Sequence, residues 1–389
     1  MRFEFATSNR IIFGLGTFSE VGAVAAELGD RALVVSGITI EQTRSLLNML
    51  SENGIDSEFY LISEEPTVSV VQQGVDIARD AKSNLIIGFG GGSAIDTGKA
   101  IAALVTNKGD ILDYLEVIGG GKPIKKEPLP YIAIPTTAGT GAEVTRNAVI
   151  GSTKHRVKVS LRSPLMLPNI AIVDPELTYS LPPQVTASTG MDALTQVLEP
   201  YVSIVSNPLT EALCKEGIQY AARSLVRVYQ DGNDRIARQG MALVSLFGGL
   251  ALANANLGAV HGFAGPLGGM YDAPHGAICA RLLPPVMSKN VEALKSRGID
   301  RDLLRRYDEV GTLLTGDTNA IADDGVHWVY ALSEKLDIPP SRIGVYGGSH
   351  GGYATMRCLT FPGEINGNKA SFDWGFGMSH AGFSDIVHF

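Results

Sequence analysis

Two histidines, a carboxylate and an amide are spaced so that they could bind one metal ion. His261 and His275 lie in a stretch of small and apolar residues, 259–276. Asp192 and Gln196 are spaced i and i+4 in a segment with helical periodicity, so both side chains project from one helix face. A lone histidine is more often a hydrogen-bonded core residue than a ligand. Because the histidines come with carboxylate and amide donors, the pattern predicts a site for one divalent metal ion.

A glycine-rich loop earlier in the chain has the composition of a phosphate-binding site. The apolar run 85–89 leads into three glycines and then into a helix. Glycines let the backbone approach an anion closely, and the free N–H groups of the helix start point at it. The spacing is not G-x-G-x-x-G, and the alternative is a tight turn that only packs strand on helix. We interpret the loop as a pyrophosphate site. The residues expected to contact the cofactor are Gly90, Gly91, Gly92, Ser93 and Asp96.

Three further segments are candidates for cofactor binding. One is the turn after the apolar run 31–36, the second is the loop after 130–134, and the third is the strand-like stretch 156–161. Hydroxyls and glycines at the end of a strand can hold a ribose, an amide or a phosphate, although an ordinary loop and a solvated lysine are the commoner outcomes. The candidate residues are Gly37, Thr136, Thr137, Thr140 and Lys158.

Short apolar runs and helical patterns alternate through the first part of the chain. The runs 31–36, 58–62, 85–89 and 130–134 predict strands, and 18–28, 41–53 and 68–81 predict helices. This alternation indicates a parallel sheet covered on both faces, which binds ligands beyond the carboxyl ends of its strands. The elements therefore place the glycine-rich and threonine-rich loops on one edge of the sheet.

The pattern changes near Leu181. Beyond it, 186–202, 208–228, 234–255 and 321–336 all show helical periodicity with few strand patterns. We therefore predict an α/β Rossmann-like dinucleotide-binding domain over 1–180 and an all-α metal and substrate domain over 181–337. An atypical tail follows at 338–389.

Composition limits the classes of partner. The chain has 389 residues, of which 45% are hydrophobic and 19% are charged, as in a soluble globular protein with ample core. A net charge of −8 without a long basic run argues against nucleic acid as a partner. Neither a signal peptide nor an apolar run of membrane-spanning length is evident, so we expect no membrane partner. Three scattered cysteines fit a reducing compartment, and we expect a cytoplasmic protein.

Five motifs in order resemble the iron-containing (group III) alcohol dehydrogenase family over roughly residues 5–337. They are GGGSAID at 90–96, PTTAGTGAEVT at 135–145, DPELT at 174–178, GMDALT at 190–195 and the segment 261–275. The resemblance implies hydride transfer between NAD or NADP and a small alcohol or aldehyde, a divalent metal such as Fe²⁺ or Zn²⁺, and a homo-oligomer. It implies metal ligation by Asp192, Gln196, His261 and His275, with His261 and His275 as catalytic residues.

Three positions depart from the family's pattern. Gln196 stands where the family usually has a histidine, and an amide oxygen is the weaker donor to Fe²⁺ or Zn²⁺. Gly265 stands where many members carry a histidine that can relay a proton. Gly37 stands where NAD-preferring relatives tend to hold an aspartate, so a 2′-phosphate is not repelled and NADP is admissible.

The family resemblance stops at about residue 339. The segment 342–355 resembles the G-x-S-x-G nucleophile elbow of a prolyl oligopeptidase-type α/β-hydrolase, with Ser349 as the nucleophile. Only 40 residues follow Ser349 (389 − 349), too few for the rest of a hydrolase sheet. Three other functions stay open beside a metal-dependent dehydrogenase: a metal-free reductase similar to maleylacetate reductases, a serine hydrolase through Ser349, and an inactive fusion.

Overall fold

The computed structural model describes residues 2–338, except 64, 156, 272, 299 and 300, together with four short strands in the tail. Residues Met1–Leu336 form one compact unit and Asp337–Phe389 a second. Within the first unit, a parallel α/β part is followed by an all-helical part, which confirms the predicted fold class.

Six parallel strands form the central sheet in the order β1-β8-β5-β4-β2-β3. They are β1 (Arg10–Phe13), β2 (Arg31–Ser36), β3 (Asp56–Leu61), β4 (Leu85–Gly90), β5 (Tyr131–Pro135) and β8 (Ile170–Val173). In the central pairing, Val34 lies opposite Ile87 on one side and Phe59 on the other. Strand β4 is buried along its whole length, as its apolar sequence requires of a strand covered on both faces.

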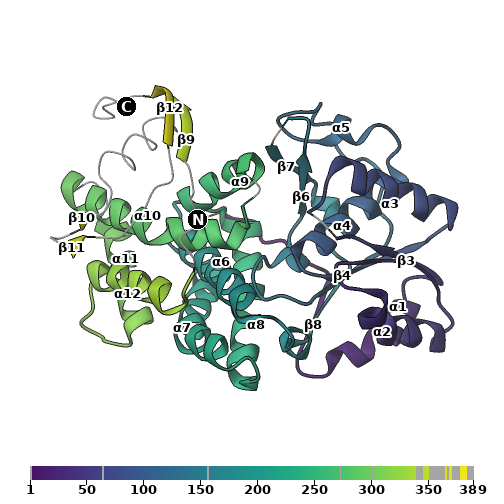
Figure 1. The fold of residues 1–389 in the computed structure, drawn as a ribbon, viewed down its shortest axis with the longest axis horizontal. Coiled ribbons are helices and arrows are strands. Elements are labelled where there is room, and N and C mark those ends of the chain that lie inside the picture. Colours follow the sequence, from purple (N-terminus) through teal and green to yellow (C-terminus); the bar gives the residue numbers. More distant parts are fainter. Residues whose placement is uncertain are drawn as a thin grey trace. The chain divides into compact units, whose positions relative to one another are not determined.

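Helices cover both faces of the sheet (Figure 1). Because side chains alternate along a strand, Leu33 and Val35 enter a core with α3 (Val68–Asp80) and α4 (Gly92–Thr106). Their neighbours Ala32 and Val34 enter the opposite core. That core is covered by α1 (Val21–Ala26) and α2 (Ile40–Glu52). The predicted alternation of strands and helices is thereby confirmed.

An antiparallel hairpin and several short helices complete the α/β part. The hairpin is β6 (Asn147–Ser152) with β7 (Val157–Arg162), and it packs against α4. The short helices are η1 (Thr17–Glu20), α5 (Ile111–Tyr114), η2 (Ala142–Val144), η3 (Pro164–Met166) and η4 (Pro175–Thr178).

Seven helices follow among the described residues up to 338. They are α6 (Pro183–Tyr201), α7 (Pro208–Gln230), α8 (Arg235–Ala255), α9 (Ala259–Tyr271), α10 (His275–Arg297), α11 (Arg301–Thr315) and α12 (Ala322–Lys335). Small residues let α6, α7 and α8 approach closely: a Cβ on Gly190 would lie 2.2 Å from Leu225, and one on Gly240 would lie 2.3 Å from Ser224. Helix α6 packs against α7, α8 and α10, which hold its side chains in place.

Helix α8 is the one described helix that is long and apolar enough to cross a membrane. Most of it is buried, and it packs against α6, α7 and the loop that precedes η2. Its hydrophobicity is therefore accounted for by its place in the core of the fold.

The predicted boundary near 181 coincides with a change of secondary structure, since the sheet ends at Val173 and α6 begins at Pro183. The two parts nevertheless belong to one compact unit, so their separation into domains at 180 stays a prediction. In the tail, β9 (Val345–Ser349) pairs in parallel with β12 (Gly377–Gly382), and β10 (Glu364–Ile365) pairs with β11 (Asn368–Lys369). Ser349 is the last residue of β9. The rest of the expected elbow, 350–355, lies outside the described residues, so the nucleophile elbow stays a prediction.

Candidate metal centre and cofactor crevice

The glycine turns after β2 and β4 touch each other at the carboxyl edge of the sheet. Gly37 donates its N–H to the Phe89 carbonyl at 3.0 Å. A Cβ on Gly90 would lie 2.9 Å from the Ala94 Cβ and 3.0 Å from the Gly37 nitrogen, and the φ of Gly90 is 150°. In the sheet, β3 lies on one side of β2 and β4 lies on the other side. The strands that follow β2 in the chain are therefore added first in one direction and then in the opposite direction, and β2 and β4 flank the point of reversal. Open α/β sheets bind their ligands at such a switch point.

The threonine-rich loop after β5 lies against the same turn. Thr136 donates its N–H to the Gly90 carbonyl at 2.9 Å. A Cβ on Gly91 would lie 3.4 Å from Thr137, and one on Gly92 would lie 2.9 Å from Thr140. Helix α4 begins at Gly92, so the N–H groups of its first turn open onto this crevice. The structure thus brings together most of the predicted cofactor residues: Gly37, Gly90, Gly91, Gly92, Ser93, Thr136, Thr137 and Thr140.

Asp96 and Lys158 have partners within the protein. The Asp96 carboxylate accepts a hydrogen bond from the Val149 N–H at 2.9 Å and so ties α4 to strand β6. Lys158 forms an ion pair with Glu65. Their assignment to the cofactor therefore stays a prediction.

The buried side chain of Lys99 holds the threonine-rich loop through hydrogen bonds, and the sequence analysis did not identify it. Lys99 is buried and donates to the carbonyls of Ala142 and Asn147 at 2.7 and 2.8 Å. It also lies 3.5 Å from the Asp96 carboxylate. Burial raises the pKa of the nearby Glu143 to about 7, although its own backbone N–H and Lys99 act to lower it. Lys99 helps to fix the loop because one ammonium group binds two backbone carbonyls that are five residues apart.

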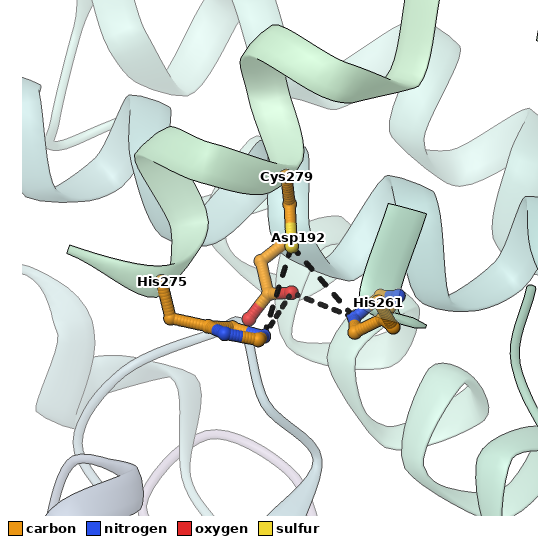
Figure 2. A group of neighbouring side chains, drawn as sticks. All are labelled: Asp192, His261, His275 and Cys279. Atoms are coloured by element: carbon orange, nitrogen blue, oxygen red, sulfur yellow. Dashed lines mark hydrogen bonds and ion pairs between the residues drawn. The ribbon is translucent and has the colours of Figure 1, made fainter. Parts of the chain in front are cut away.

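Four side chains from three helices converge on one point in the helical part (Figure 2). Asp192 comes from α6, His261 from α9, and His275 and Cys279 from α10. Asp192 Oδ1 lies 3.2 Å from His261 Nε2 and 3.6 Å from His275 Nε2. Cys279 Sγ lies 3.9 Å from His261 Nε2 and 3.7 Å from His275 Nε2. All four donor atoms lie within 4.8 Å of one another.

These separations match the edges of a coordination tetrahedron. A cation held about 2.0 to 2.3 Å from nitrogen, oxygen and sulfur donors sets neighbouring donors about 3.3 to 3.8 Å apart. The four distances between donor atoms given above, from 3.2 to 3.9 Å, lie within about 0.1 Å of this interval, so the side chains need to move little to bind a cation. The residues present therefore fit one divalent cation.

The charges within this group depend on burial and on mutual proximity. Burial alone would lower the pKa of His261, but Cys279, Asp192 and Glu199 outweigh it and raise the pKa well above its ordinary value. Burial lowers the pKa of His275, and it raises the pKa of the Cys279 thiol to about 12. Without a cation, protons thus occupy the donor atoms of His261 and Cys279, and a cation must displace them to bind.

Comparison with known proteins decides the family. Residues 8–175 match the family model of iron-containing alcohol dehydrogenases, and residues 186–347 match that of the C-terminal part of the Fe-containing alcohol dehydrogenase family. The chain belongs to the iron-containing alcohol dehydrogenase family. As a member, it is an oxidoreductase of the class that interconverts alcohols and aldehydes with NAD(P). The match runs on to residue 347, so the expected end of the family likeness at 337 was placed too early.

Several relatives share most of the chain's length. Choline dehydrogenase from Bacillus subtilis (strain 168) is 35% identical over 339 residues, which cover 84% of this chain and 81% of that protein. The crystal structure of 1,3-propanediol oxidoreductase has a TM-score of 0.80 and 33% identity, with coverage of 87% and 88%. Sulfoacetaldehyde reductase from Bifidobacterium kashiwanohense, in complex with NAD⁺, has a TM-score of 0.77 and 28% identity, with coverage of 89% and 88%. The names of these three relatives refer to three different substrates: choline, 1,3-propanediol and sulfoacetaldehyde.

Within this iron-containing alcohol dehydrogenase, Gln196 lies beside the cluster but has a protein partner. It is buried on α6, one turn after Asp192, and its amide N–H donates to the Gly139 carbonyl at 2.7 Å. That hydrogen bond leaves the amide oxygen as the atom that a cation could use. Its expected role as a ligand stays a prediction.

Sequence reasoning missed two residues of this centre. Cys279 lies i+4 from His275 on α10, a spacing that puts both side chains on one helix face. Glu199 lies two turns after Asp192 on α6 and accepts a hydrogen bond from the ring of His261 at 2.7 Å. The helical spacing of each residue could have been read from the sequence, but their partners could not.

Proposed function

We propose that this chain binds one divalent cation through Asp192, His261 and His275 and uses it, with NAD or NADP, to interconvert a small alcohol and its aldehyde. The observation that carries the proposal is the convergence of these three donors, with Cys279, from three separate helices. Bound there, the cation supplies the Lewis acidity that lowers the pKa of a hydroxyl and polarises a carbonyl. Gln196, through its amide oxygen, or Cys279, through its sulfur, completes the coordination.

Helix α9 provides room for a substrate next to the cation. A Cβ on Gly265, one turn after His261, would meet no heavy atom within 4 Å, so open space borders this face of the helix. A family member with a histidine at the position of Gly265 would fill part of this space. The small residues here support a substrate with some bulk at the carbon that bears the oxygen.

The crevice at the sheet edge supports the dinucleotide part of the proposal. The turn Gly90–Gly92 and the first N–H groups of α4 are suited to a pyrophosphate, because both present backbone donors to an anion. Gly37, after β2, offers no carboxylate to repel a 2′-phosphate, so NADP is accepted as well as NAD. The sulfoacetaldehyde reductase with the same fold was solved with NAD⁺.

The convergence of four donors supports a metal-dependent enzyme over a metal-free reductase. Nothing in the part of the chain that the structure describes supports a serine hydrolase through Ser349. The acidic charge and scattered cysteines support small molecules as partners and the cytoplasm as the place of action. From its family we propose a homo-oligomer, a dimer or larger.

Metal content and turnover, measured together, test the proposal. We expect about one divalent cation per chain by plasma mass spectrometry, and turnover of short alcohols or aldehydes with NAD(H) or NADP(H). His275→Ala should lose both the cation and turnover. His327→Ala, which removes an exposed histidine from α12, is the matched control and should keep both. Full turnover by chelated, metal-free protein would overturn the metal-dependent function.

A further inference from the structure

Both carboxylate oxygens of Glu199 are engaged at the start of helix α9. Oε2 lies 2.7 Å from Nδ1 of His261, and Oε1 accepts the N–H of Val260 at 2.7 Å. Glu199 is only 7% exposed. The side chain therefore bridges α6 to the first turn of α9 and to the ring that faces Asp192.

These contacts decide which ring nitrogen of His261 carries a proton. A carboxylate has only acceptors, and Oε1 is already matched to the Val260 N–H, so Oε2 is matched to a donor on Nδ1. The neutral ring then carries its hydrogen on Nδ1 and leaves the lone pair of Nε2 available. Nε2 is the atom that lies 3.2 Å from Asp192 and 3.9 Å from Cys279, so a cation that displaces the proton of Nε2 meets this lone pair at the centre of the cluster.

The surroundings keep the carboxylate in this orientation. Glu199 forms part of the wall of a cavity of about 410 Å³ that is otherwise lined mainly by apolar side chains from α6, α10 and α11. Hydrogen bonds to a charged group are stronger where water is scarce. Gly258 leaves space for the Glu199 carboxylate, because a Cβ at this position would lie 2.7 Å from Glu199 Oε1.

We propose that Glu199 is the positioning residue of the metal centre: it holds the His261 ring in one orientation and one tautomer, with Nε2 directed at the cation. This inference rests on the proposed metal site and adds a residue that does not touch the cation. A carboxylate that accepts from the second nitrogen of a ligating histidine raises the basicity of the first, and its loss typically weakens metal affinity about 10- to 100-fold.

Glu199→Gln is the direct test. A glutamine places an N–H₂ group where one of the two acceptors stood, so it faces either the Val260 N–H or the His261 Nδ1–H. We expect the affinity for Co²⁺, measured by competition with a chelator, to fall about 10- to 100-fold. Glu309→Gln makes the same chemical change on α11, where Glu309 accepts from the Tyr201 hydroxyl, and should leave the affinity within about threefold.

Gly258→Ala is a second variant, which leaves every charged group in place. Its methyl group displaces the Glu199 carboxylate sterically, so Co²⁺ affinity should fall in the same direction, and the result stands even if Glu199→Gln does not fold. The proton NMR spectrum of the Co²⁺-loaded protein gives a readout that a purely structural role would not move. The cobalt-shifted Nδ1–H signal of His261 should be protected from exchange in the wild type and lost or fast-exchanging in Glu199→Gln.

The outcomes separate this inference from the proposed function. If wild-type protein does not bind Co²⁺, the metal site is wrong and this inference falls with it. If wild type, Glu199→Gln and Gly258→Ala bind Co²⁺ with equal affinity and show the same protected N–H, the metal site stands and the positioning role of Glu199 is wrong.

Discussion

Gly37 and Gly90, 53 positions apart in the chain (90 − 37), are in backbone contact. Gly37 donates its N–H to the carbonyl of the residue before Gly90, and a Cβ on Gly90 would lie 3.0 Å from the Gly37 nitrogen. The turn that can recognise the ribose of a dinucleotide and the turn that can hold its phosphates are thereby fixed against each other. Side chains introduced at Gly37 should consequently change cofactor choice.

Gly37→Asp should shift the preference from NADPH towards NADH. A Cβ at Gly37 would meet the Ala94 Cβ at 3.5 Å, an ordinary contact, so the variant should fold. Repulsion of a 2′-phosphate by one carboxylate in a partly solvated crevice is worth about 1 to 3 kcal/mol, or about ten- to a hundredfold in relative affinity. The ratio of kcat/KM for the two cofactors measures the shift. Gly37→Asn supplies the same shape without charge, and an equal shift in Asn would show that charge is not the cause.

Gln196→His should raise the affinity for the cation about tenfold or more, because imidazole is a stronger donor to Fe²⁺ or Zn²⁺ than an amide oxygen. Competition with a chelator measures the affinity, and Gln219→His on α7 serves as the control. If Gln196→His lowers the affinity for the cation, Gln196 acts through its hydrogen bond to the Gly139 carbonyl and not as a ligand.

Cys279→Ser should remove a thiolate-to-cobalt charge-transfer band from the near-ultraviolet spectrum of the Co²⁺-loaded protein. The sulfur lies within 3.9 Å of both histidine Nε2 atoms, and a thiol that coordinates a cation gives up its proton despite the raised pKa. Cys214→Ser, a change at a buried cysteine outside the cluster, should leave the band intact. A wild-type spectrum without the band would leave Gln196 as the remaining fourth donor.

Glu143→Gln should remove a pH dependence of stability. The pKa of Glu143 is about 7 in the fold against 4.5 in an unfolded chain, so the folded state binds the proton more tightly. Stability contributed by this group is complete below about pH 4.5, falls as pH rises towards 7, and is constant above. We expect Glu143→Gln to gain about 1 to 3 kcal/mol relative to wild type between about pH 5 and pH 8.

Urea denaturation at these two pH values measures the gain for Glu143→Gln. Glu216→Gln, a change at an exposed residue of α7, should show no such difference. A gain that is equal at both pH values would contradict the proposed ionisation of Glu143.

The sequence by itself determined the elements, the order of the two parts and the family. Apolar runs such as 31–36 and 85–89 form buried strands because their periodicity is local, and the motif containing Asp192 lies on a helix for the same reason. The sequence also indicated the types of donor for a cation: the carboxylate of Asp192 and the two imidazoles of His261 and His275.

Only the tertiary structure decided which partners these residues meet. The contact of Gly37 with Gly90 depends on β4 pairing with β2, and strand order is set by pairing between segments distant in sequence. Likewise, Cys279 and Glu199 have helical spacings that fit a core residue equally well. Their roles follow from the packing of α6, α9 and α10 around one point, because the energy of that packing belongs to contacts that no local pattern contains.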